Sequence, residues 1–293
     1  MRRTGLILLM LFAARIAWPQ TPEDTYKVNI ARWRVAHEQL LKMDDGWLTL
    51  AGLYWLREGA NRLGTASDDA VVVPSAAASG ELGVLTVRNG QVTVAITPGS
   101  HVLVNGALVS TATLEPEDDT LTIGSVSMTI ISRDDQLGVR VRDTQSAARL
   151  HFPGERWFPV DPAYRVVATF VPYSQPKPID VPNVLGGSYA MQSPGYVTFT
   201  LGDQAIRLDA ILEQPNARQL FYLFTDATSG HATYPAGRFL YSDLPRRRRV
   251  VLDFNRAFNP PCAFTPYATC PLPPPGDRLS IPIDAGEQAL PTP

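Results

Sequence analysis

The residues of this chain that could do chemistry gather near its C-terminus. Acidic, amide and guanidinium side chains recur over residues 226–287. Two carboxylates can serve as general acid and general base, and an arginine can bind a carboxylate or phosphate through two parallel hydrogen bonds. We therefore identify Asp226, Asp253 and Glu287 as candidate catalytic residues. The candidate ligand-binding residues are Thr228, Ser229, Tyr234, Arg238, Asn255, Asn259 and Arg278.

Three functions are compatible with this set of residues. The first, which we favour, is a module that binds a small polar or anionic ligand in the second half of the chain. The second is a hydrolase whose acid and base are carboxylates. The third is a structural or interaction protein in which the same charges form a buried ion-pair network. Two carboxyl groups roughly 5 to 9 Å apart across an open cleft would favour hydrolysis. The distance between the carboxyl groups and their exposure would therefore distinguish the three functions.

The two cysteines lie in the same region. Cys262 and Cys270 are separated by seven residues, and in an exported chain this spacing predicts a local disulfide. The four histidines have no spacing typical of a zinc site. Phosphate-binding glycine loops and dinucleotide fingerprints do not occur in the sequence. The sequence thus implies neither a metal nor a cofactor.

The elements that must position these residues are mainly strands. Residues 21–46 begin with Thr-Pro-Glu-Asp, which predicts a capped helix that ends before Gly46. Short alternating runs follow, and Asn-Gly turns at 89–90 and 105–106 predict hairpins. We expect a mainly β fold with two sandwich or barrel-like halves, at 47–150 and 151–293. The proline-rich C-terminal segment is expected to be an irregular loop, because proline lacks the backbone donor.

The first twenty residues predict the cellular location of the protein. Arg2 and Arg3 precede a short apolar run and several alanines, which is typical of a secretory signal. We therefore expect a periplasmic or secreted protein with no stable membrane insertion after cleavage of residues 1–20. The mature chain would hold 23 basic and 28 acidic residues instead of 26 and 28, a formal charge of −5. That charge argues against nucleic acid as a partner.

The first half weakly resembles a forkhead-associated (FHA) domain. The resemblance rests on the glycine turns and strands at 59–64, 99–106 and 114–124. FHA domains hold phosphothreonine with an arginine, a serine and a histidine in the loops between these strands. Here Thr65 follows Gly64 and residues 76–79 are Ala-Ala-Ala-Ser, so the resemblance implies a degenerate, structural sandwich.

Several motifs resemble domain of unknown function family 1684, an uncharacterised family of bacteria and archaea. They are Asp226 to Gly230, Thr233 to Leu240, Asp253 to Cys262, Cys270 to Pro274, Arg278-Leu279 and Ala285 to Glu287. Gly46 to Leu56 and Arg140 to Asp143 resemble its front half. The chain departs at Asp277, where the family pattern has asparagine. The resemblance supports the location of the site and implies no particular reaction.

Overall fold

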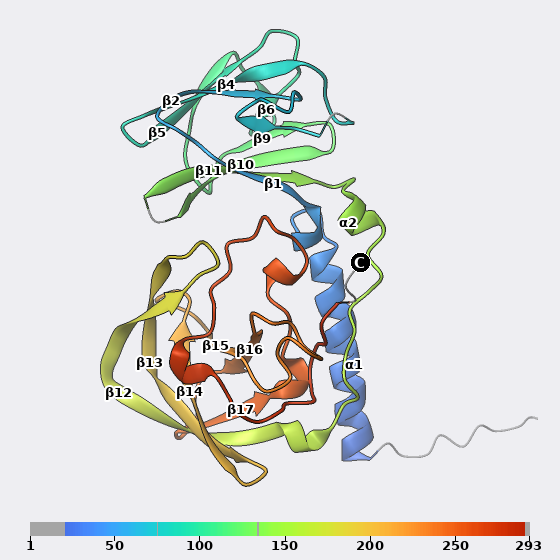
Figure 1. Ribbon diagram of the computed structural model, residues 1–293, viewed down its shortest axis with the longest axis vertical. Coiled ribbons are helices and arrows are strands. Elements are labelled where there is room, and N and C mark those ends of the chain that lie inside the picture. The colour runs from blue at the N-terminus through green and yellow to red at the C-terminus, as the bar shows by residue number, and fades with distance from the viewer. Residues whose placement is uncertain (1–20, 75, 134, 291–293) are drawn as a thin grey trace, which may run out of the picture.

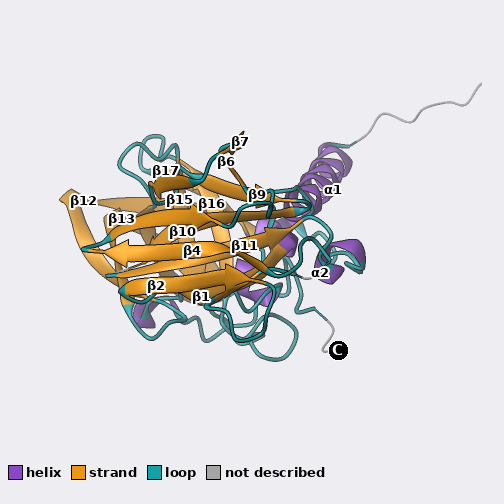
Figure 2. Ribbon diagram, turned by 90° about the horizontal axis from the view of Figure 1, so that it is seen from above, coloured by secondary structure: helices purple, strands orange, loops and turns teal. Residues whose placement is uncertain are grey.

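A computed structural model describes residues 21–74, 76–133 and 135–290. Figure 1 shows a β-sandwich above a strongly curved sheet, with a long helix running along one side of the curved sheet. Both helices lie on the same side of the strands (Figure 2). The predicted signal peptide lies outside the described residues.

The long helix, α1 (Pro22–Leu41), begins as its sequence predicts. The Thr21 side chain accepts a hydrogen bond from the Asp24 backbone, and the Asp24 side chain accepts one from the Thr21 backbone, which completes a capping box. Pro22 occupies the first turn, where its missing N–H costs nothing. The helix ends at Leu41, and Gly46 N–H then donates to Met43 O in the following turn.

The upper sandwich consists of two sheets. One has the strand order β1-β11-β10-β9-β6-β7 and the other the order β3-β2-β4-β5-β8. Their inner faces enclose a core of Val, Leu, Ile and Met side chains. The strands are β1 (Leu50–Trp55), β2 (Gly59–Gly64), β3 (Val71–Val72), β4 (Glu81–Arg88), β5 (Gln91–Ile96), β6 (Leu103–Val104), β7 (Ala107–Leu108), β8 (Thr111–Leu114), β9 (Thr120–Ile123), β10 (Val126–Arg133) and β11 (Gln136–Asp143).

Both Asn-Gly pairs form the predicted hairpin turns. Asn89 and Gly90 join β4 to β5, and Asn105 and Gly106 join β6 to β7. All four residues have positive φ, which is the backbone that a tight two-residue hairpin requires and that Asn-Gly adopts readily.

The lower half is a single sheet with the order β16-β15-β14-β13-β12-β17. Its edge strands β16 and β17 contact each other, so the sheet is a nearly closed barrel. The buried side chains inside it include Phe199, Tyr222, Phe224 and Phe254. The strands are β12 (Arg165–Pro182), β13 (Ser188–Leu201), β14 (Gln204–Leu212), β15 (Gln219–Phe224), β16 (Arg238–Asp243) and β17 (Arg249–Asp253).

The remaining elements are short. They are α2 (Ala147–Leu150) and the 3₁₀ turns η1 (Trp47–Thr49), η2 (Pro162–Tyr164), η3 (Phe254–Arg256), η4 (Pro261–Ala263) and η5 (Pro275–Asp277). The C-terminal segment after β17 has no strand among the described residues and lies between the barrel sheet and α1 (Figure 1). The mainly β fold, the N-terminal helix and the irregular C-terminal loop are thus confirmed.

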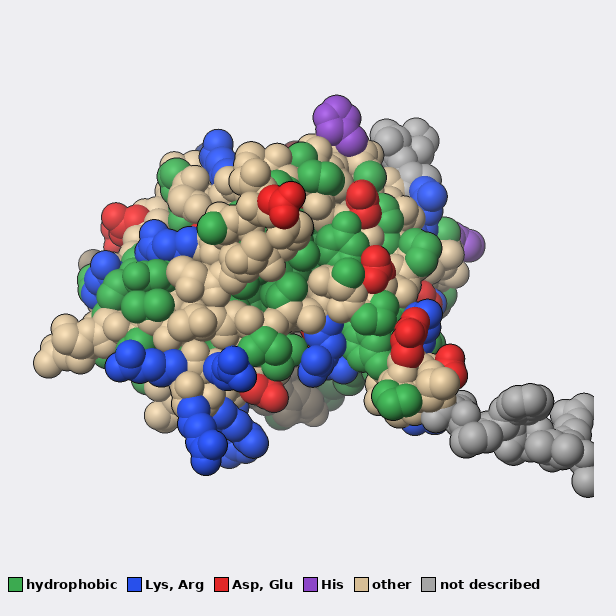
Figure 3. Space-filling model, turned by 90° about the horizontal axis from the view of Figure 1, so that it is seen from below, with side chains coloured by type: hydrophobic (Ala, Val, Ile, Leu, Met, Phe, Trp, Pro, Cys, Tyr) green, Lys and Arg blue, Asp and Glu red, His purple; other side chains and the backbone are tan. Residues whose placement is uncertain are grey.

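The run of arginines at 246–249 makes the turn between β16 and β17. Arg246 and Arg249 exchange two backbone hydrogen bonds, and Arg247 and Arg248 between them have φ of 50° and 61°. All four side chains are exposed. Basic side chains gather toward one edge of the face in Figure 3.

Candidate functional site

Asp226 and Arg238 form an ion pair that is closed to solvent. Arg238 Nη2 donates to Asp226 Oδ2 at 2.7 Å, and both side chains are 0% exposed. The guanidinium also donates to Ile283 O at 3.0 Å and to Ala285 O. The pair thus ties the C-terminal segment to the start of β16. No face of this guanidinium is open to a ligand. This is the geometry expected of a structural protein with a buried ion-pair network.

Neighbouring hydroxyl groups stabilise the turn that begins at Asp226. Thr228 Oγ1 donates to Asp226 Oδ1 at 2.6 Å, and Ser229 Oγ accepts from Asp226 N at 3.1 Å. Tyr234 donates its hydroxyl to Cys262 O at 3.0 Å. These three predicted ligand contacts therefore hold loops in place.

Asp253 and Asn255 dock the N-terminal helix onto the barrel. Tyr26 of α1 donates its hydroxyl to Asp253 Oδ1 at 2.8 Å. Asn255 Nδ2 donates to Asp161 O at 2.8 Å and to the Tyr26 oxygen at 3.0 Å. Arg34, two turns further along the helix, donates to Phe158 O at 3.0 Å. Both predicted site residues thus act as anchors for α1.

Of the remaining predicted residues, Arg278 is exposed and Asn259 and Glu287 are buried. Arg278 forms a backbone bridge with Thr225 on the loop after β15. Asn259 N donates to Glu287 Oε2 at 2.7 Å. The structure therefore brings Asn259 and Glu287 together, and the three candidate carboxylates each have separate partners.

A cleft of about 1010 Å³ lies between the sandwich, the barrel and α1. Asn259 is the only ligand-binding residue predicted from the sequence that lines it; Arg238 and Arg278 do not. Its walls come from β10, β11, β13, β15, β16, the C-terminal half of α1 and the loop at 258–271. The volume is at the upper end for sites that hold a small molecule.

Arg140 of β11 lines this cleft without a countercharge. The residue is 9% exposed, its Nε has no hydrogen-bond partner among the described residues, and none of the ion pairs between them includes it. Its guanidinium lies 5.7 Å from the centre of the Trp47 ring. Burial, together with the nearby Arg133 and Arg142, lowers the pKa of Arg140 to about 10. It stays charged at neutral pH, so a buried cation faces the cleft unpaired.

Aromatic rings form a continuous wall of the cleft. Phe221 stacks on Tyr241 at 4.9 Å between ring centres, and Tyr241 stacks on Phe258 at 5.9 Å. Phe258 lies 4.7 Å from the His37 ring, which stacks on Trp33 at 5.1 Å. These side chains give the cleft an apolar wall.

Asn259, which lines the cleft, and Glu287, which it contacts, have unused hydrogen-bonding capacity. Burial raises the pKa of Glu287 well above its usual range, and the neighbouring Glu155 carboxyl adds to the rise. Glu287 Oε1 and Asn259 Oδ1 have no hydrogen-bond partner among the described residues. Asn259 Nδ2 donates to Gln288 O at 2.9 Å, which fixes the orientation of the amide.

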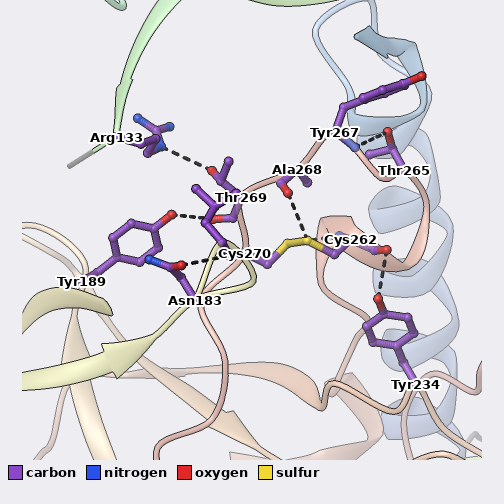
Figure 4. Close-up of a disulfide and its surroundings, with 11 residues drawn as sticks. Arg133, Asn183, Tyr189, Tyr234, Cys262, Thr265, Tyr267, Ala268, Thr269 and Cys270 are labelled. Atoms are coloured by element: carbon purple, nitrogen blue, oxygen red, sulfur yellow. Dashed lines mark hydrogen bonds between the residues drawn. A yellow bond between two sulfur atoms is a disulfide. The ribbon is translucent and has the colours of Figure 1, made fainter. Parts of the chain in front are cut away.

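The predicted disulfide is present and shapes another wall of the cleft. Cys262 and Cys270 are joined, with their Cα atoms 6.2 Å apart. The loop that they close is tied on both sides: Tyr189 donates its hydroxyl to Thr269 O at 2.9 Å, and Arg133 Nε donates to Thr269 Oγ1 at 3.3 Å (Figure 4). The disulfide loop therefore joins the barrel to the sandwich across the cleft.

Sequence reasoning missed Arg140, His37 and Glu155. Arg140 alternates with Val139 and Val141, which in isolation indicates a solvated strand face. Trp33 and His37 are four residues apart on α1 and so share one helix face, a signal that was available. Nothing in the sequence pairs His37 with Glu155, which is 118 residues away.

Within the described residues, no group of three or more His, Cys, Asp or Glu side chains is arranged to hold a metal ion. Among the same residues, no helix combines the length and the apolar composition needed to cross a membrane.

The chain is a β-rich protein in which a barrel and a sandwich, bound to one helix, border a cleft with apolar walls, two arginines (Arg133 and Arg140) and two acids (Asp45 and Glu213). Residues 150–288 match the model of the family described as "Protein of unknown function (DUF1684)", which confirms the resemblance seen in the sequence. No curated protein matches the chain.

Solved structures with partial likeness were also found. An uncharacterized protein of Haloarcula marismortui is 32% identical over 48% of this chain and 78% of its own, with a TM-score of 0.40. The FHA-2 domain from a Mycobacterium tuberculosis ABC transporter is 31% identical over 29% of this chain and 77% of its own, with a TM-score of 0.24. The likeness to FHA domains is thus weak and confined to part of the chain.

Proposed function

We propose that this protein is exported and binds a small anionic ligand with a flat apolar body in the cleft between its two halves. The observation that carries the proposal is Arg140. A charge withdrawn from water costs several kcal/mol unless another charge or hydrogen bonds compensate it. Arg140 forms no ion pair among the described residues, and its Nε has no hydrogen-bond partner there. Glu117 favours its charge but is itself paired with Arg133, and a carboxylate or phosphate in the cleft would compensate Arg140 directly.

The shape of the ligand is inferred from the wall. Phe221, Tyr241 and Phe258 present stacked rings along the cleft. A planar ligand body could lie against them, because offset stacking adds to the gain from buried apolar area. Arg133, which also lines the cleft, is already bonded to Glu117 at 2.8 Å. Arg133 would therefore add positive electrostatic potential to the cleft, but it would not offer the ligand a free pair of N–H donors.

Export rests on the pattern of residues 1–20 alone. A basic start, a short apolar run and small residues before Gln20 favour cleavage by a signal peptidase. The disulfide is consistent with an oxidising compartment. Sequencing the N-terminus of the protein from an extracytoplasmic fraction tests this part. A mature chain that still begins at Met1 would contradict it.

Binding can be tested by thermal unfolding with matched pairs of probes. We would compare 4-hydroxybenzoate with 4-hydroxybenzamide, and indole-3-acetate with indole-3-acetamide. The anion of each pair should raise Tm and the amide should not, since only the anion can compensate Arg140. A ligand present at 100 times its Kd adds about 2.7 kcal/mol to the stability. Equal shifts within both pairs would contradict an anion site.

Two variants on the same strand sharpen the test. Arg140→Met removes an uncompensated buried charge, so it should keep or raise Tm without ligand and abolish the shift caused by the anions. Arg142 also lies over Trp47, at 5.6 Å, but it donates to Gly46 O at 2.9 Å and does not line the cleft. Arg142→Met should therefore lower Tm and keep the ligand shift. If Arg140→Met retained the shift, the proposal would fail.

A further inference from the structure

His37 places an oriented imidazole in the wall of the cleft. Its Nδ1 lies 2.6 Å from Glu155 Oε1, and the two side chains are 13% and 0% exposed. A carboxylate accepts hydrogen bonds, so we assign the proton to Nδ1. Trp33 and Phe258 pack on the ring at centre distances of 5.1 and 4.7 Å and hold its plane. The other ring nitrogen, Nε2, has no partner among the described residues.

The buried carboxyl of Glu155 holds this imidazole, and the buried carboxyl of Glu287 lies near Glu155. Glu155 Oε2 and Glu287 Oε1 are both shut off from solvent, and neither has a hydrogen-bond partner among the described residues. Two neighbouring buried carboxyls cannot both ionise at low cost. Burial and the Glu155 carboxyl both raise the pKa of Glu287. The Glu155 carboxyl, 2.6 Å from His37 Nδ1, is placed to stabilise a positive charge on His37.

We propose that His37 is a general base that activates water to hydrolyse an ester bound in the cleft. This proposal rests on the proposed function, since the ester would be the bound anion or a derivative of it. The arrangement of a nitrogen base held by a carboxylate on its other nitrogen is the one that general-base catalysis requires. Glu155 is a positioning residue.

Water is the nucleophile that we assign, because the thiols and the aliphatic hydroxyl of the cleft are already engaged. Both cysteines are joined in the disulfide. Among the residues lining the cleft, Thr269 carries the only aliphatic hydroxyl, and that oxygen accepts from Arg133 at 3.3 Å. His37 Nε2 takes a proton from water, and the water oxygen forms a bond to the acyl carbon. The bond from that carbon to the leaving oxygen breaks, and His37 returns the proton to that oxygen. The products are an acid and an alcohol, and no oxidant or cofactor enters the balance.

The experiment measures release of 4-hydroxybenzoate from 4-acetoxybenzoate, an ester that carries the flat anionic body proposed above. Wild type should exceed the buffer rate, and His37→Gln should lower kcat at least about 100-fold, the usual share of a general base. Glu155→Gln should lower kcat with little change in KM and should alter the acid limb of the pH profile. His231→Gln is the control, because His231 is exposed and does not line the cleft. It should leave the rate unchanged.

The outcomes separate this proposal from the binding function. An increase in the Tm of His37→Gln on addition of 4-hydroxybenzoate would show that this variant is folded and still binds the anion. If wild type binds 4-hydroxybenzoate and hydrolyses neither 4-acetoxybenzoate nor neutral phenyl acetate, the catalytic proposal is wrong and the binding site stands. If phenyl acetate is hydrolysed in a His37-dependent way and 4-hydroxybenzoate does not bind, the anion site is wrong and the base stands. Full activity in His37→Gln overturns the catalytic proposal.

Discussion

Arg140 and Arg238 are both buried arginines, and their surroundings give them opposite roles. Arg238 has a carboxylate at 2.7 Å and two backbone oxygens, so its charge is compensated within the fold. Arg140 lies over an aromatic ring and forms no ion pair among the described residues. Removal of one member of a compensated pair leaves the other buried and unpaired, whereas removal of an uncompensated charge relieves a cost. The sign of the stability change therefore distinguishes a structural arginine from one that awaits a ligand.

Asp277 is a third buried ionisable group, and it predicts a dependence of stability on pH. Its Oδ1 accepts from Asp209 N at 3.0 Å, and its Oδ2 has no hydrogen-bond partner among the described residues. Burial is the main cause that raises its pKa to about 8. The unfolded chain would have the ordinary value near 3.9. Between these values the folded state binds more protons than the unfolded state, so stability falls as pH rises from about 4 to about 8.

The variant Asp277→Asn removes this group from titration. We expect it to be more stable than wild type at pH 8, with an advantage that shrinks by roughly 1 kcal/mol for each pH unit toward pH 5. Urea unfolding of both proteins at pH 5, 6.5 and 8 measures it. An advantage that did not change with pH would show that Asp277 is not held neutral.

At the scale of elements, the disulfide loop is the part of the cleft wall that depends on a covalent bond. Cys262 and Cys270 are eight positions apart, and closing so short a loop constrains the unfolded chain by about 2.5 kcal/mol. The double variant Cys262→Ser, Cys270→Ser should lose about that much stability in urea unfolding. Since Thr269 also receives bonds from Tyr189 and Arg133, ligand binding should weaken as well. A variant with unchanged binding would place the ligand away from this loop.

The elements that the sequence predicts well are those set by local chemistry. The capping box at Thr21, the Asn-Gly turns and the nearby pair of cysteines each depend on residues within about ten positions of one another. The site depends on distant pairs. An aspartate and an arginine suit either a ligand-binding site or a structural ion pair. Asp226 and Arg238 form a structural pair because both are buried and Arg238 also bonds to the carbonyl groups of Ile283 and Ala285. No local pattern shows which face of a strand another layer will cover.

At the scale of the whole molecule, the sandwich is an insertion between a helix and the barrel on which that helix packs. Tyr26 bonds to Asp253, and His37 to Glu155. The sandwich begins and ends side by side, because Gly52 of β1 pairs with Val141 of β11. The core of the sandwich contains only residues from 63 to 141. The helix and the barrel thus form one unit in space although 123 residues lie between Leu41 of α1 and Arg165 of β12.

This topology predicts that the sandwich can be removed. Joining Gly52 to Val141 through a short Gly-Ser linker bridges Cα atoms that strand pairing holds within about 5.5 Å. The remaining chain keeps both core clusters of the barrel. We expect cooperative thermal unfolding with near-UV circular dichroism retained, and no stabilisation by 4-hydroxybenzoate, because Arg133 and Arg140 are gone. The full chain with Arg140→Met is the matched control, and it should share the loss of binding. An excised chain that unfolds without cooperativity would show that the barrel needs the sandwich for its stability, whereas one that still binds the anion would move the ligand site into the barrel.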